Sequence, residues 1–200
     1  MRVGLYFGTF NPIHVGHLII ANHMAERDDL DQIWLVISPQ NPLKSSGGLL
    51  ADYHRLALVK IAIDDNYKLR ASDVEFALSL PSYTSDTLAH LKENYPEHQF
   101  ALIMGEDNLR TFHKWKNFEV ILDKHKIYVY PRPITITELQ DSVQTTKSGI
   151  AKHPNVIVTD SPMMQISSTH IRNKIRSGQS IQYMVTDPVR SYIDEMNFYR

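Results

Sequence analysis

The chain has 200 residues, with 21 Lys and Arg, 22 Asp and Glu, no Cys and a formal net charge of −1. This charge balance argues against a broad nucleic-acid-binding surface, which needs concentrated positive charge. The lack of cysteine excludes disulfides, thiolate metal sites and a cysteine nucleophile. No apolar run approaches the roughly 20 residues of a membrane span, and residues 1–8 are too short for a signal-peptide core. We therefore expect a soluble, cytoplasmic protein that binds neither nucleic acid nor membrane.

The first 37 residues predict a strand–helix–strand unit. Residues 3–7 are apolar on both faces, as in a strand buried within a parallel sheet. A helical pattern with one apolar stripe follows over 15–27, and residues 33–37 form a second buried strand. This unit is the building block of open parallel sheets with right-handed crossovers.

The same alternation continues to the end of the chain. Residues 39–50 and 133–153 are expected to be loops, the second long enough to be an insertion or lid. Thr84 and Asp187 are expected to cap helices. We expect a single domain over residues 1–200, of the α/β class, with an open, mostly parallel, doubly wound (Rossmann-like) sheet and helices on both faces. The expected helices are 52–63, 84–94, 115–124, 168–177 and 188–198, the expected strands are 100–104, 127–130 and 156–158, and residues 67–80 are expected to be extended or mixed.

The segment from Gly8 to His17 follows the first strand and carries the first candidate chemistry. It is neither a Walker loop nor the dinucleotide G-x-G-x-x-G fingerprint. His14 and His17 are three residues apart, so both can project from one face of the first helical turn, beside the unpaired N–H groups of the helix start. Gly8 is expected to allow a sharp turn and the close approach of a ligand. A polyphosphate site, an ordinary turn with two surface histidines and a metal-binding pair all remain open on these residues alone.

Two motifs carry a resemblance to a known superfamily. The pattern Gly8-x-Phe10-x-Pro12-x-His14-x-Gly16-His17 resembles the HIGH signature of nucleotidylyltransferases. About 150 residues later, Ile166–Arg172 is similar to the ISSTxIR motif of the same superfamily. The two motifs occur in the expected order.

Three further stretches narrow the resemblance to bacterial nicotinate-nucleotide adenylyltransferases. They are Pro81–Leu88 (similar to S-Y-T-x-D-T-L), Gly105–Leu109 with the following Phe112 and Trp115 (similar to G-x-D-x-L…F…W), and Pro42–Lys44 (similar to P-P-H-K). Leu43 departs from the last pattern, because histidine is common at that position. From the residues alone, Thr84 could simply start a helix, Trp115 could pack in the core and Lys44 could be solvated.

The resemblance implies adenylyl transfer from ATP to nicotinate mononucleotide, giving nicotinate adenine dinucleotide and pyrophosphate in NAD biosynthesis. Catalysis of this reaction needs positioning and electrostatic stabilisation and no protein nucleophile. Mg²⁺ is expected to be carried by the substrate phosphates, with no protein metal site. A homo-oligomer is possible. The alternatives are nicotinamide mononucleotide or phosphopantetheine as the acceptor, or a non-catalytic nucleotide sensor.

The resemblance also implies roles for individual residues. His14, His17, Lys44 and Arg172 are the expected catalytic residues, which bind phosphates and stabilise charge at the α-phosphorus. Gly8, Thr9, Phe10, Ser167, Ser168 and Thr169 are the expected ATP-binding residues. Thr84, Asp107, Trp115 and Arg132 are the expected substrate-binding residues: Thr84 for the nicotinate carboxylate, Asp107 for a ribose, Trp115 for the pyridine ring and Arg132 for a phosphate.

Overall fold

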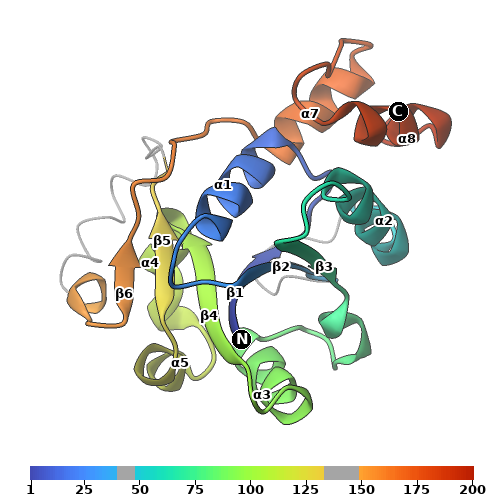
Figure 1. The fold of residues 1–200 in the computed structure, drawn as a ribbon. Helices are drawn as coiled ribbons and strands as arrows, with labels where there is room; N and C mark the ends of the chain where they lie inside the picture. The colour runs from blue at the N-terminus through green and yellow to red at the C-terminus, as the bar shows by residue number, and fades with distance from the viewer. Residues whose placement is uncertain (40–47, 133–148) are drawn as a thin grey trace.

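Within residues 1–39, 48–132 and 149–200, which the computed structural model describes, six parallel strands form one open sheet (Figure 1). The strand order is β3-β2-β1-β4-β5-β6, so the order reverses at β1 and β4 in the middle of the sheet. The strands are β1 (Arg2–Gly8), β2 (Gln32–Ile37), β3 (Leu69–Ser72), β4 (Gln99–Gly105), β5 (Ile127–Tyr130) and β6 (Val156–Val158). This order is that of the doubly wound fold, in which ligands bind where the strand order reverses. The expected fold class is confirmed.

Helices cover both faces of the sheet, and each set of helices encloses its own hydrophobic core (Figure 1). One core is closed by α1 (Val15–Ala25), α2 (Asp52–Ala62), α7 (Ser168–Arg176) and α8 (Asp187–Glu195). The other is closed by α3 (Thr84–Asn94), α4 (Glu106–Thr111) and α5 (Phe118–Lys124). Short 3₁₀ turns lie at Val74–Ala77, Phe112–Lys114 and Ile150–Lys152.

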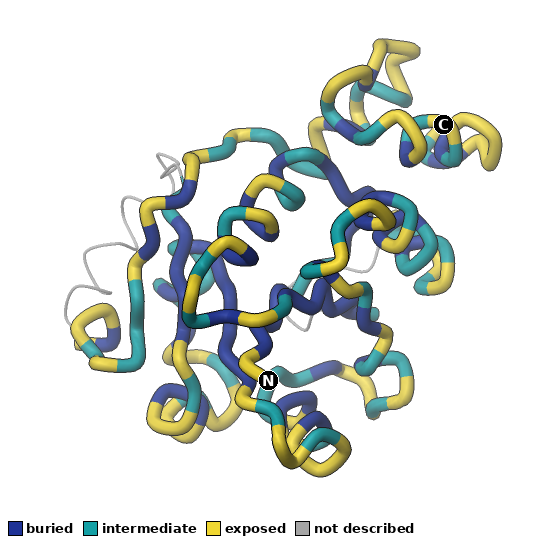
Figure 2. Tube along the Cα trace, viewed as in Figure 1, coloured by how far each residue is buried: buried dark blue, intermediate teal, exposed yellow. Residues whose placement is uncertain are grey.

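Strand β2 shows how one strand serves both cores. Ile33 and Leu35 pack into the core under α1 and α2, whereas Trp34 and Val36 pack into the core over α3 to α5. All four side chains are almost fully buried, and Figure 2 shows the central strands as the buried part of the trace. Burying a large apolar side chain stabilises the fold by about 1.5–3 kcal/mol, so this two-sided pattern requires helices on both faces.

Most expected elements are confirmed, and three, Thr84–Asn94, Ile127–Tyr130 and Val156–Val158, have the expected bounds. The expected helix 115–124 is partly wrong, because α5 begins only at Phe118 and Trp115 precedes it. Helix α4 was not expected. It is a helix of only 6 residues directly after β4, too short to show an apolar period.

The expected helix caps are each displaced by one residue. Helix α3 has Tyr83 at its N-cap position, and Thr84 is its first helical residue. Helix α8 has Thr186 at its N-cap position, and Asp187 and Pro188 lie in its first turn. Neither N-cap side chain makes a capping hydrogen bond, so the preference for Ser, Thr, Asp and Asn at caps does not locate these two boundaries.

The long loops expected at 39–50 and 133–153 fall mainly outside the described residues, and Lys44 lies outside them. None of the helices in the described part of the chain is long and apolar enough to cross a membrane.

Candidate active site

A pocket of about 490 Å³ lies at the carboxyl ends of β1, β4 and β5, where the strand order reverses. Its walls come from the loop after β1, the first turns of α1 and α4, the residues after β5 and the start of α7. The lining residues are Tyr6, Phe7, Gly8, Thr9, Phe10, Asn11, His14, Gly16, His17, Ile20, Leu49, Asp107, Asn108, Tyr130, Pro131, Arg132, Met164, Ile166, Ser167, Ser168, Thr169 and Arg172. Two segments about 150 residues apart in sequence therefore share one cavity.

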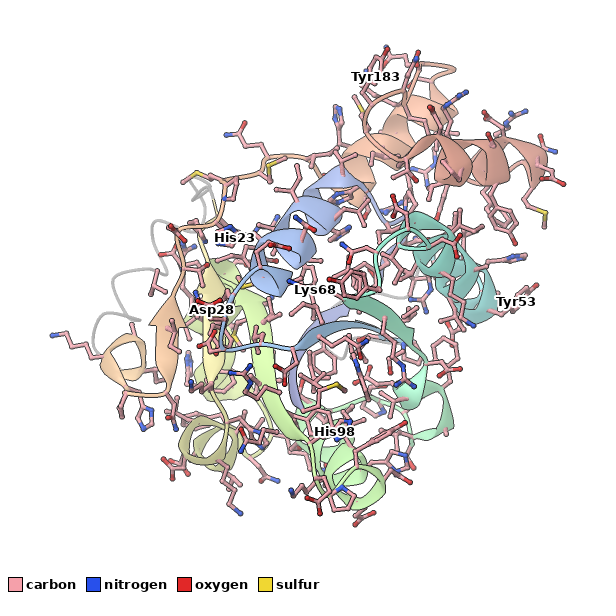
Figure 3. The ribbon with its side chains drawn as sticks, in the orientation of Figure 1. His23, Asp28, Tyr53, Lys68, His98 and Tyr183 are labelled. Atoms are coloured by element: carbon pink, nitrogen blue, oxygen red, sulfur yellow. The ribbon has the colours of Figure 1, made fainter. Side chains whose placement is uncertain are left out.

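His14 and His17 form the histidine pair of this pocket. Their rings are stacked with centroids 3.7 Å apart and an angle of 21° between the planes. His14 occupies the N-cap position of α1, and its backbone N–H donates to Nδ1 of His17 at 3.3 Å. The two histidines therefore support each other at the helix start. Figure 3 labels His23 and Asp28, which lie at and beyond the opposite end of α1.

His14 is electrically neutral at ordinary pH. Only 5% of its surface is exposed, and its Nδ1 is buried without a hydrogen-bond partner in the described part of the chain. Burial, with the positive charge of Arg132 as a second cause, lowers the pKa of His14 from 6.5 to about 4. His14 therefore faces the pocket as an uncharged hydrogen-bonding group.

Helix α7 brings the second motif against the first. Ser167 is its N-cap residue and accepts the backbone N–H of His170 at 3.2 Å. The hydroxyl of Ser168 donates to the carbonyl of Pro12 at 2.9 Å. The first backbone N–H groups of the helix have no partner within it and lie at the pocket wall, where they suit an anion.

Arg172 crosses from α7 to the loop after β1. Its Nη1 donates to the carbonyl of Asn11 at 2.8 Å, and its Nη2 donates to the hydroxyl of Thr169 at 3.1 Å. These bonds hold the guanidinium at the rim of the pocket that also contains His17. The planar fork has five N–H donors, so it can also bind phosphate oxygens.

The loop after β1 departs from expectation at Gly8. The left-handed residue of the loop is Phe10, with φ of 44°, and Gly8 is not in that region. A Cβ on Gly8 would lie 2.8 Å from the Phe10 ring. Gly8 therefore makes room for the Phe10 ring, and the expectation that it provides the sharp turn is wrong.

Asp107 and Arg132 form an ion pair on the β4–β5 side of the pocket. Arg132 Nη1 lies 3.5 Å from Asp107 Oδ2, and Oδ1 is buried without a hydrogen-bond partner among the described residues. Gly105 leaves space for this pair, because a Cβ there would lie 2.3 Å from Asp107 Oδ1 and 2.7 Å from Arg132 Cδ.

The pocket brings together most of the site residues expected from the sequence. Thr84 lies in the first turn of α3 and Trp115 packs on Phe112 with ring centroids 5.2 Å apart, and neither lines the pocket. Lys44 lies outside the described residues. The expected residues that line the pocket are Gly8, Thr9, Phe10, His14, His17, Asp107, Arg132, Ser167, Ser168, Thr169 and Arg172.

Among the lining residues that were not expected from the sequence are Tyr6, Asn11 and Tyr130. Tyr6 and Tyr130 come from buried strands, where an aromatic side chain is ordinary core. Asn11 stands at a variable position of the HIGH signature. For Tyr130, the sequence offered one signal of a place in the site: it stands at the carboxyl end of an expected parallel strand, before Pro131 and Arg132.

At one end, the site combines the neutral imidazole of His14, the imidazole of His17, the guanidinium of Arg172 and a helix N-terminus. At the other end, an acidic and basic pair lies beside two phenols. The first end suits a polyphosphate, since its donors can surround phosphate oxygens. None of the described residues forms a group of three or more His, Cys, Asp or Glu that could hold a metal ion.

Comparison with known proteins agrees with this geometry. The sequence model of the cytidylyltransferase-like family matches residues 5–174. A probable nicotinate-nucleotide adenylyltransferase of Flavobacterium johnsoniae is 56% identical over 200 residues, with both chains fully covered. The chain belongs to the nicotinate-nucleotide adenylyltransferase family.

More distant relatives of the same family also match over the whole chain. The probable nicotinate-nucleotide adenylyltransferase of Exiguobacterium sibiricum is 35% identical over 199 residues, covering 100% of this chain and 99% of the relative. The nicotinic acid mononucleotide adenylyltransferase of Plasmodium falciparum, solved in complex with NaAD, has a TM-score of 0.77 at 21% identity over 99% of this chain and 97% of that one. This structural likeness supports the fold.

Proposed function

We propose that this protein transfers the adenylyl group of ATP to nicotinate mononucleotide in NAD biosynthesis. The phosphate oxygen of the mononucleotide attacks the α-phosphorus of ATP, the bond from that phosphorus to the β-phosphate bridge breaks, and pyrophosphate leaves. The products are nicotinate adenine dinucleotide and pyrophosphate.

One observation carries the proposal. His14, His17, Arg172 and the start of α7 line a single pocket at the point where the strand order reverses. Had His17 and Arg172 lain on opposite sides of the molecule, no triphosphate could have contacted both. The close family relatives supply the identity of the acceptor.

The phosphate end of the pocket performs the catalysis in this proposal. His17 and His14 bind ATP phosphates and stabilise the charge that develops at the α-phosphorus, and Arg172 neutralises phosphate oxygens. The backbone amides of Ser167, Ser168 and Thr169 add donors at the start of α7, and Gly8, Thr9 and Phe10 contribute backbone groups. No covalent enzyme intermediate is needed, since both reacting groups are held in place.

The acceptor contacts rest on the family resemblance. We expect Thr84 and nearby amides to bind the nicotinate carboxylate and Trp115 to stack on the pyridine ring. Asp107 accepts a hydrogen bond from a ribose, and Lys44 and Arg132 neutralise phosphate. Mg²⁺ enters with the substrate phosphates, which are its preferred ligands together with water. We further expect the protein to act in the cytoplasm, without nucleic acid or membrane partners, and to be able to form homo-oligomers.

A pyrophosphate-release assay with ATP and three acceptors tests the function. We expect turnover with nicotinate mononucleotide far above that with nicotinamide mononucleotide or phosphopantetheine. Equal or higher turnover with either alternative acceptor would reassign the substrate. ATP binding without pyrophosphate release from any acceptor would point to a sensor.

A further inference from the structure

Two tyrosine hydroxyls lie together on the wall of the pocket, and the proposed chemistry leaves them unused. Tyr6 comes from β1 and Tyr130 from the end of β5, and both line the pocket. The Tyr6 hydroxyl donates to the Tyr130 oxygen at 3.4 Å, and the rings meet edge to face with centroids 5.9 Å apart. Both side chains are over 90% buried.

The two tyrosines carry two hydroxyl protons, and only one of these takes part in the hydrogen bond between them. Each phenol carries one proton, and burial raises the pKa of both, so both stay protonated near neutral pH. Tyr6 gives its proton to Tyr130, whose oxygen the Arg132 guanidinium also approaches. Among the described residues, Tyr130 has no acceptor for its own proton. A buried donor without an acceptor is costly, which points to an acceptor supplied by a ligand.

An acidic group lies next to this spare donor. The Cβ position of Gly105 is approached by Asp107 Oδ1 at 2.3 Å, Arg132 Cδ at 2.7 Å and Tyr130 Cζ at 3.2 Å, so the three side chains converge on one point. Because Oδ1 is buried, Oδ2 is the oxygen of Asp107 that a ligand can reach. A phenol donor beside a carboxylate acceptor matches a pair of neighbouring hydroxyl groups, one of which accepts and one of which donates.

The position of the tyrosine pair in the pocket indicates that the group it binds is the sugar of a nucleotide. The Tyr6 ring lies edge-on to the His17 ring with centroids 6.2 Å apart, and the charge of Arg132 acts on His14. The tyrosine pair therefore adjoins the phosphate end of the site. In ATP and in nicotinate mononucleotide, the group bonded directly to phosphate is ribose.

We propose that the Tyr130 hydroxyl donates a hydrogen bond to a ribose hydroxyl of a bound nucleotide, and that Asp107 Oδ2 accepts from the neighbouring hydroxyl. Tyr130 is then a specificity-determining residue that recognises ribose over deoxyribose. This inference rests on the proposed function only for the identity of the two nucleotides.

Tyr130→Phe tests the contact, because it removes the hydroxyl and keeps the ring. Tyr128→Phe is a matched control: Tyr128 lies in the same strand, is buried, donates to Asp29 at 2.7 Å and does not line the pocket. KM and kcat are measured for both substrates and for 2′-deoxy-ATP, 3′-deoxy-ATP and 2′-deoxy nicotinate mononucleotide, with Tm as a check on folding.

We expect Tyr130→Phe to raise KM for one nucleotide by roughly three- to tenfold, as the loss of a neutral hydrogen bond predicts, with kcat nearly unchanged. In this variant, the ratio of KM for one deoxy analogue to KM for that nucleotide should fall toward one. The analogue that the variant binds as well as the parent nucleotide shows whether the contacted sugar belongs to ATP or to the mononucleotide. Tyr128→Phe should lower Tm without changing either KM.

The inference is overturned if Tyr130→Phe keeps wild-type KM values and sugar preference, or if it raises KM equally for the nucleotide and its deoxy analogues. Failure of the proposed function gives a different result, since the wild-type protein would then form no nicotinate adenine dinucleotide. In that case, calorimetric binding of ATP and of nicotinate mononucleotide to the wild type and the two variants decides the sugar contact without catalysis.

Discussion

The backbone around His17 determines which of its ring nitrogens carries a proton. Nδ1 accepts the backbone N–H of His14, so in the neutral ring the proton resides on Nε2. The ring is also held between His14, stacked at 3.7 Å, and Phe10, edge-on at 5.0 Å. His17 is therefore oriented before a substrate arrives, and in the neutral ring Nε2–H is the donor that the proposed function assigns to phosphate.

His17→Ala is expected to lower kcat by roughly a hundredfold or more, as removal of one preorganised donor does in other enzymes. The free energy of unfolding should fall by much less than this loss of transition-state stabilisation, because His17 is only half-buried. Steady-state pyrophosphate release and urea unfolding measure the two quantities.

His90→Ala provides the matched histidine control for this variant. His90 lies on α3, where its Nε2 is 3.1 Å from the side-chain amide of Asn94, and it does not line the pocket. Its substitution should leave kcat near the wild-type value. If His17→Ala also keeps near-normal turnover, the proposed phosphate role is refuted.

The depressed pKa of His14 predicts a pH dependence of stability. The folded-state value of about 4 lies below the ordinary 6.5, so between these values the unfolded chain binds a proton that the folded chain does not. Stability is unaffected by this group above pH 6.5 and falls as the pH is lowered toward 4, by about 3 kcal/mol over the whole window. His14→Asn should remove this part of the dependence, and denaturant unfolding at pH 7 and pH 5 measures it. Equal slopes in both proteins would contradict the assignment.

The role of a residue could be predicted from the sequence where the residue belongs to a recognised motif. Roles that depend on how a side chain is buried in the fold were harder to predict. His14, His17 and Arg172 were expected together and line one pocket. Phe10 was expected to contribute backbone to the nucleotide, yet its ring fills the space above Gly8. The sequence predicts Tyr130 only as part of a strand, because a single sequence does not show which buried tyrosine hydroxyl lacks a hydrogen-bond acceptor.

At the scale of elements, the site depends on how closely α1 approaches the segment before α7. Gly16 in α1 is buried, and a Cβ there would lie 2.5 Å from Cγ2 of Ile166. The hydroxyl of Ser168 ties the same segment to Pro12. The absence of a side chain at Gly16 thus brings the two motifs together.

Gly16→Ala is expected to push Ile166 and the start of α7 away from α1, which displaces Arg172 from the pocket rim. Because small misplacements of catalytic groups reduce rates strongly, kcat/KM should fall by about tenfold or more. Steady-state kinetics with varied ATP measure the effect, and unfolding measurements report any loss of stability.

Gly4→Ala is the control for steric strain without displacement of the site. A Cβ at Gly4 would lie 2.7 Å from Cδ1 of Ile103 and 2.9 Å from Cδ1 of Ile33, within the core of the sheet. It should lower stability, since overpacking a core costs about 1–3 kcal/mol, with little change in KM for ATP. If Gly16→Ala and Gly4→Ala affect kinetics alike, the approach of the two motifs is not the cause.

Elements were predictable from the sequence in proportion to their length and periodicity. The strand Ile127–Tyr130 and the helix Thr84–Asn94 carry clear apolar patterns and sharp polar boundaries, and their bounds were correct. Residues 106–117 hold one short helix, a 3₁₀ turn and Asn117 in the left-handed region, so no single period applies. A continuous helix from Trp115 was therefore the wrong interpretation.

At the scale of the whole molecule, Asn11 connects distant parts of the chain at the pocket. Its carbonyl accepts from Arg172, its side-chain amide donates to the carbonyl of Gly48 at 3.0 Å, and Oδ1 accepts from the backbone of Leu50 at 3.2 Å. The hydroxyl of Tyr199, the penultimate residue, donates to the same Oδ1 at 2.9 Å. Such contacts join segments far apart in sequence, and sequence patterns, which are local, do not reveal them.

The C-terminal segment is therefore expected to influence the site although it follows the last helix. Tyr199→Phe should lower the free energy of unfolding by about 1 kcal/mol, the usual net value of a hydrogen bond, and should raise KM for ATP a few-fold because the loop after β1 loses one of its supports. Tyr192→Phe is the control: its hydroxyl contacts His54 Nδ1 at 3.3 Å, away from the pocket, so it should cost similar stability without changing KM. Urea unfolding and ATP titrations of both variants make the comparison. An unchanged KM in Tyr199→Phe would restrict the C-terminal segment to a purely structural role, because the bonds to Gly48 and Leu50 would then suffice to hold Asn11.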